Sequence, residues 1–60
     1  MKIDANIKLP DDFYAALIDA HEGLTEDASF ELNARMVFLL ANQIGDSEVL
    51  LSCIAEAAKS

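Results

Sequence analysis

The hydrophobic and polar residues follow two different periods along the chain. Over residues 1–9 every second side chain is apolar, which is the period of an extended strand. From Pro10 onward the apolar residues recur every three or four positions, as they do in amphipathic helices. The pattern predicts an extended N-terminal arm over residues 1–9, followed by helices over residues 10–22, 26–44 and 47–59. The apolar residues of the arm are Ile3, Ala5, Ile7 and Leu9.

Residues typical of helix ends separate the three predicted helices. Gly23 and Gly45 suit the left-handed conformation that ends many helices. Thr25 can cap the second helix, and either Asp46 or Ser47 can cap the third. The helices are therefore expected to be separate elements joined by connections of a few residues.

Short connections make consecutive helices antiparallel neighbours. The sequence therefore predicts a single all-α domain over residues 1–60, folded as a small three-helix bundle or as a helical hairpin array behind the arm. The first helix carries one apolar stripe that should face its neighbours. This stripe is formed by Phe13, Ala16, Leu17 and Ala20.

The helix predicted over residues 26–44 is more apolar than its neighbours can cover. At 100° per residue its apolar side chains span an arc of roughly 220°. The other two helices are short and rich in alanine on their inner faces, so they cover about two sides of it. Small domains often complete a deficient core by association, and we expect a second chain to cover the remainder. The residues expected at that interface are Asn33, Arg35, Met36, Phe38 and Leu40.

Asn33 projects into the middle of this apolar arc. Burying an amide without partners costs about 1 to 3 kcal/mol, so we expect the side chain to be hydrogen-bonded. One interpretation is a bond to the backbone of a neighbouring helix or of the arm. The other is a bond to the same residue of a second copy, where it would fix the register of a dimer. The sequence leaves both open.

The charge balance narrows the possible partners. Eleven acidic residues against four basic ones give a formal charge of -7, and the basic residues are scattered. Nucleic-acid binding and attraction to anionic membranes both rest on clustered Lys and Arg, so neither is expected. The longest apolar run has six residues, far short of the about 20 needed to span a bilayer. With no apolar leader pattern and a single cysteine, Cys53, a cytoplasmic protein is the expectation.

Two residues with reactive side chains have ordinary structural interpretations. His21 has no second metal-binding residue at helical spacing, which favours a histidine at the rim of the helix packing. Cys53 lies on the inner face of the third helix with no nearby base, as expected of an inert thiol. We therefore expect no catalytic, metal-binding or cofactor-binding residue, and no enzyme.

An alternative assigns a covalent role to Ser47. The segment around Asp46 and Ser47 resembles the Asp-Ser-Leu attachment site of acyl carrier proteins, which are also small, acidic and helical. Glu48 stands where that motif has Leu, and only 13 residues follow Ser47. Helix capping explains the same residues more simply. An acyl-carrier-like protein modified at Ser47 remains the alternative function.

Four segments carry a resemblance to a known family. They are Pro10-Asp11-Asp12-Phe13-Tyr14, Ala20-His21-Glu22-Gly23-Leu24, Leu32-Asn33-Ala34-Arg35 and Leu39-Leu40-Ala41-Asn42-Gln43-Ile44-Gly45-Asp46. In these segments the chain resembles the small bacterial proteins grouped as domain of unknown function 2783, which are commonly encoded beside flavin-dependent aromatic hydroxylases and metal-dependent hydrolases. The resemblance implies a small accessory subunit. Together with the apolar second helix it predicts a non-enzymatic interaction or accessory protein, acting as a homo-oligomer or docked on a metabolic enzyme.

Overall fold

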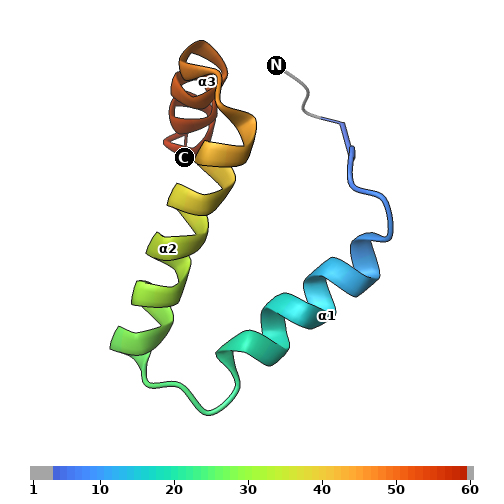
Figure 1. Cartoon of the computed structure of the whole chain (residues 1–60), viewed down its shortest axis with the longest axis vertical. Helices are drawn as coiled ribbons and strands as arrows, with labels where there is room; N and C mark the ends of the chain where they lie inside the picture. The colour runs from blue at the N-terminus through green and yellow to red at the C-terminus, as the bar shows by residue number, and fades with distance from the viewer. Residues whose placement is uncertain (1–3, 60) are drawn as a thin grey trace.

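Three helices account for the regular secondary structure of the part of the chain that the structure describes, residues 4–59. In this computed structural model α1 spans Pro10–His21, α2 spans Glu26–Ile44 and α3 spans Ser47–Ala57 (Figure 1). The predicted all-α fold class is confirmed. Residues 4–9 form neither helix nor strand, and the first three residues of the predicted arm, Ile3 among them, lie outside the described residues.

The backbone leaves the right-handed helical conformation at both ends of α1. Leu9, the residue before Pro10, is left-handed with φ 53° and ψ 56°, and its carbonyl accepts the first helical hydrogen bond. At the other end Glu22 leaves the helix with ψ 128°, and Gly23 follows with φ 74°. The helix therefore ends at His21, one residue before the predicted end, because the turn into Gly23 already begins at Glu22.

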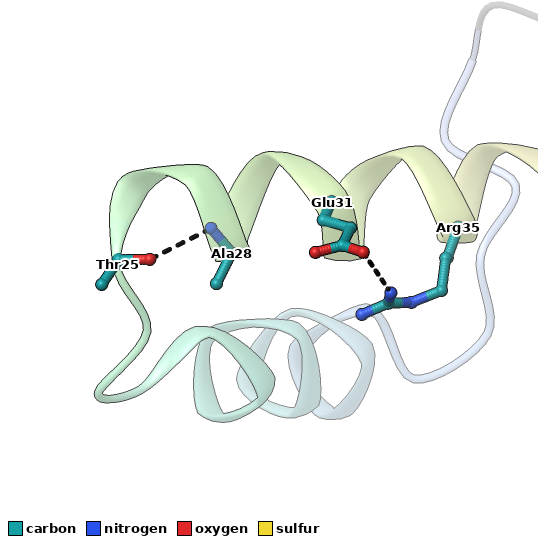
Figure 2. Close-up of polar contacts among 4 residues, drawn as sticks. All are labelled: Thr25, Ala28, Glu31 and Arg35. Atoms are coloured by element: carbon teal, nitrogen blue, oxygen red, sulfur yellow. Dashed lines mark hydrogen bonds and ion pairs between the residues drawn. The ribbon is translucent and has the colours of Figure 1, made fainter.

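The ends of α2 agree with the prediction. The Thr25 hydroxyl accepts a hydrogen bond from the backbone N–H of Ala28 at 3.2 Å, which satisfies one of the free donors of the first turn (Figure 2). Gly45 adopts φ 73° and donates its N–H to the carbonyl of Ala41 at 2.8 Å. The hydroxyl cap and the left-handed glycine thus delimit a helix of 19 residues.

Asp46 is the cap of α3. Its Oδ1 atom accepts hydrogen bonds from the backbone N–H groups of Glu48 at 3.0 Å and Val49 at 3.3 Å. The helix ends at Ala57, two residues earlier than predicted. Beyond it the N–H of Lys59 donates to Glu56 three residues back, so the chain closes into a tighter turn instead of continuing the helix.

The helices are arranged as an open array along α2. Helix α1 diverges from α2 after the connecting turn, and α3 folds back beside the C-terminal part of α2 (Figure 1). None of residues 4–59 is fully buried. The radius of gyration of the Cα atoms is 13.1 Å, whereas a compact chain of this length would have roughly 10 Å. The fold therefore corresponds to the open form of the predicted hairpin array.

Candidate functional site

The first feature that could bind a partner is an apolar groove between α1 and α2, here called the α1–α2 groove. Its volume is about 370 Å³. From α1 it is lined by Phe13, Ala16, Leu17 and Ala20, and from α2 by Leu32, Arg35, Met36 and Leu39. The four residues from α1 are the predicted apolar stripe, so the prediction that they face a neighbour is confirmed. Arg35 is the only charged residue among the eight.

A second groove, the α2–α3 groove, lies between the C-terminal part of α2 and α3. Its volume is about 380 Å³. Its lining consists entirely of apolar residues, namely Val37, Phe38, Leu40, Ala41, Ile44, Leu50, Cys53 and Ile54. Helix α2 thus carries apolar side chains toward two different neighbours, and each neighbour covers them from one side only.

The exposure of the lining side chains shows how incomplete this cover is. Phe38 is 76% exposed and Leu39 is 61% exposed, and these two adjacent residues line different grooves. Leu17, Leu32 and Met36 are half-buried. The expectation that α1 and α3 leave much of α2 uncovered is confirmed. Between residues 4 and 59 no helix combines the length and apolar character needed to cross a membrane.

A hydrogen-bonded pair, His21 and Asn33, links α1 to α2 near the turn that connects the two helices. The Nε2 atom of His21 lies 3.0 Å from Oδ1 of Asn33, and Nδ1 donates to the carbonyl of Leu17 at 2.7 Å. The doubly protonated ring donates at both nitrogens. The neutral ring makes the same contacts when Nδ1 carries the proton and the Asn33 amide turns its NH₂ group toward Nε2. The pair therefore holds the end of α1 against α2 in either form of the ring.

This pairing corrects the expected environment of Asn33. The side chain is exposed in the single chain, in which α1 diverges from α2 (Figure 1). Within the chain its hydrogen-bond partner is the side chain of His21 and not a backbone group, whereas a contact between the Asn33 residues of two copies stays a prediction. The interpretation of His21 as a rim histidine agrees with its half-buried position.

Arg35 lies at the edge of the α1–α2 groove. Its Nη1 atom is 3.3 Å from Oε1 of Glu31, one helical turn earlier (Figure 2). Both side chains are about two-thirds exposed, so the pair contributes only about 0.3 to 0.5 kcal/mol. The guanidinium group thus stays accessible to a partner.

The structure divides the predicted interface residues between the two grooves. Arg35 and Met36 line the α1–α2 groove, whereas Phe38 and Leu40 line the α2–α3 groove. Asn33 lines neither and bonds to His21. The sequence pattern does not predict the contact between His21 and Asn33. Their positions on facing sides of consecutive helices were the available signal. The role of all five residues in association stays a prediction.

The residues with reactive side chains lie apart from one another. Cys53 is half-buried in the α2–α3 groove, and Ser47 is exposed at the first position of α3. Within residues 4–59 no three His, Cys, Asp or Glu side chains are grouped as metal ligands. The Asp46 carboxylate next to Ser47 is occupied in capping the helix.

The arrangement described so far is that of a small helical protein with open apolar grooves. The family model described as "Protein of unknown function (DUF2783)" matches residues 1–59. The chain therefore belongs to this family, as the resemblance in its four segments predicted. No curated protein and no solved structure matches it.

Proposed function

We propose that this chain is a non-enzymatic interaction protein whose grooves on α2 are docking surfaces. The observation that carries the proposal is the exposure of the apolar side chains. Within residues 4–59 no side chain is fully buried, while Phe38, Leu39 and Ile54 are each more than 60% exposed. Contiguous apolar surface of this kind on a small protein marks interaction sites, because exposing it to water is unfavourable.

The size of the chain supports the same function. A 60-residue domain gains little net stability from its own core, and association is one of the ways in which such domains are stabilised. In each groove two helices expose apolar side chains against which a further helix could pack. A partner that supplies a helix or an apolar face would complete either groove.

The partner in this proposal is a protein, either a second copy of the chain or a metabolic enzyme. The formal charge of -7 disfavours nucleic acid and anionic membranes as partners. Among enzymes, the family resemblance given in the sequence analysis indicates a flavin-dependent aromatic hydroxylase as the first to be tested. In that case the chain would act as an accessory subunit without chemistry of its own.

The experiment is affinity capture from the native host with four baits. These are the natural chain, Leu39→Glu in the α1–α2 groove, Ile54→Glu in the α2–α3 groove, and Ile18→Glu as control. Ile18 is 66% exposed, close to Leu39 at 61% and Ile54 at 64%, but it lines neither groove. The three changes add the same charge at similarly exposed sites, so they differ mainly in the surface that they alter.

The expected result is a stoichiometric protein partner that Ile18→Glu retains and at least one groove variant loses. The partner is then identified by mass spectrometry and its binding is repeated with purified components. The proposal would be refuted by a natural chain that captures nothing and unfolds cooperatively as a monomer, because its grooves would then be stable without a partner.

A further inference from the structure

We infer that the occupant of the α1–α2 groove is the same groove of a second copy, in a two-fold symmetric dimer with four helices at its centre. The inference rests on the proposed function and names the partner of one of its two docking surfaces. Three observations support a second copy: the amount of surface left exposed, the spacing of the groove residues along α2, and the distribution of charge.

The exposed area is large enough for a stable dimer. The accessible surface of the chain is 5439 Å², whereas a compact 6.5 kDa protein exposes about 3,800 Å². The excess is therefore roughly 1,600 Å², and part of it belongs to the exposed residues 4–9. In a standard stable interface each partner buries about 800 Å². Half of the excess area of this chain is therefore enough for such an interface.

The groove residues of α2 are placed symmetrically about the middle of the helix. Leu32 and Leu39 lie at equal distances on either side of the pair Arg35 and Met36, and residue 35 is the midpoint of Glu26–Ile44. A two-fold axis that passes between residues 35 and 36 of the α2 helices would place Leu32 of each copy opposite Leu39 of the other. The dimer would contain this contact two times. Isologous contacts of this kind require a self-complementary surface, and this spacing provides one.

The charge distribution favours contact through this groove. The chain has eleven acidic residues, and none of them lines the α1–α2 groove. Two copies that meet through it keep their carboxylates away from the centre of the contact, where like charges would be most costly. The single charged residue of the lining, Arg35, has its backbone next to the proposed axis, but its side chain is 65% exposed and its guanidinium group is paired with Glu31 of the same helix. This pairing offsets the positive charge that each copy brings to the contact.

The hydrogen bond between His21 and Asn33 holds the groove in shape before the copies meet. It fixes the end of α1 against α2 through the 3.0 Å contact. The stripe with Phe13 and Leu17 is thereby kept on the same side as Leu32 and Met36. A groove whose two walls are already joined requires less ordering on association.

The primary test is sedimentation equilibrium of the purified full chain across a hundredfold range of concentration. The natural chain is expected at twice 6.5 kDa in the upper part of this range. Leu39→Glu is expected to weaken dimerisation at least a hundredfold, and Ile18→Glu is expected to leave it within threefold of the natural chain. Both changes add one negative charge at a site of similar exposure, but only Leu39 lines the groove.

A cross-linking test does not depend on a destabilising charge. In a Cys53→Ser background, Met36→Cys should form an interchain disulfide under mild oxidation, because packed helix axes 8–10 Å apart bring facing Cα atoms near the axis within disulfide range. Ile18→Cys in the same background should remain monomeric on a non-reducing gel. Equal cross-linking at both positions would overturn the two-fold arrangement.

The outcomes also separate this inference from the proposed function. A natural chain that stays at 6.5 kDa and unfolds without cooperativity overturns the dimer, but leaves docking on a different protein in place. A 6.5 kDa chain that unfolds cooperatively and captures no protein overturns both. A dimer that survives Leu39→Glu also overturns the inference, because its interface must lie outside the α1–α2 groove.

Discussion

At the scale of single residues, the hydrogen bond between His21 and Asn33 is the polar contact that ties α1 to α2. The two residues are twelve positions apart, and the bond closes the loop that contains Gly23 and Thr25. The side-chain bonds of Thr25 and Asp46, by contrast, are local helix caps. The pair therefore adds a specific polar contact to the apolar residues that α1 and α2 place in the α1–α2 groove.

A double-mutant cycle with His21→Phe and Asn33→Ala should measure this contact. We expect a coupling free energy of about 0.5 to 1 kcal/mol, because the bond is a side-chain contact that water reaches. The quantity to compare is the free energy of unfolding from urea titrations of the natural chain, the two single variants and the double variant. A parallel cycle between His21 and the distant Asn42 should be additive. Additivity in the first cycle would show that the bond does not form in solution.

Ser47 allows a second test at this scale. If the chain is an interaction protein, Ser47 is only the first residue of α3, and protein purified from its native host should have the mass of the unmodified chain. An acyl-carrier-like function would instead add a prosthetic group to the hydroxyl. Intact mass spectrometry distinguishes the two, with the Ser47→Ala chain as control. An adduct that disappears in Ser47→Ala would establish the carrier alternative.

At the scale of the elements, the ends of the helices were the most predictable part of the structure. The boundaries of α2 follow from Thr25 and Gly45, whose effects are local and do not require knowledge of the packing. Helices α1 and α3 end one and two residues earlier than the sequence pattern predicts. At the end of α1 the chain already turns at Glu22, one residue before the left-handed Gly23 that marks the stop in the sequence. At the end of α3 the C-cap is Ala58, whose side chain carries no stop signal.

Gly45 should be the most sensitive position of the turn between α2 and α3. Its φ of 73° strains any residue with a Cβ atom, although an added Cβ would meet only the carbonyl oxygen of Asn42 at 3.9 Å. Gly45→Ala is therefore expected to lower the free energy of unfolding by about 1 kcal/mol. Gly45→Asn should cost less, because asparagine tolerates the left-handed region better. Equal urea midpoints for the natural chain and Gly45→Ala would contradict this assignment.

The segment before α1 allows a prediction about protection. Ile7 is 48% exposed and Leu9 is 71% exposed, so a single chain leaves the apolar side of this segment uncovered. In the assembled protein we expect these side chains to be covered and the amides of residues 4–9 to exchange more slowly than in a free peptide. Hydrogen exchange with mass spectrometry measures this directly. Exchange at the free-peptide rate would show that the segment is a tail that contacts nothing.

At the scale of the whole molecule, the sequence predicts that much apolar surface of α2 is uncovered. It does not predict which side chains line the α1–α2 groove and which line the α2–α3 groove. The apolar arc of α2 can be counted from the sequence, and so can the small size of the helices beside it. Which side chains share a groove depends on the directions in which α1 and α3 leave α2, and these are set by a few contacts such as the one between His21 and Asn33. Neighbours in the sequence, Phe38 and Leu39, consequently line different grooves.

The absence of a fully buried side chain within residues 4–59 also has a consequence for the lifetime of the protein in the cell. Proteases degrade a chain through its open states, and a chain with few buried contacts has little free energy to prevent such opening. Copies that have not found their partner should therefore be cleared quickly, whereas assembled copies persist. The cellular amount of this protein would then follow the amount of its partner, without a separate mechanism to match the two.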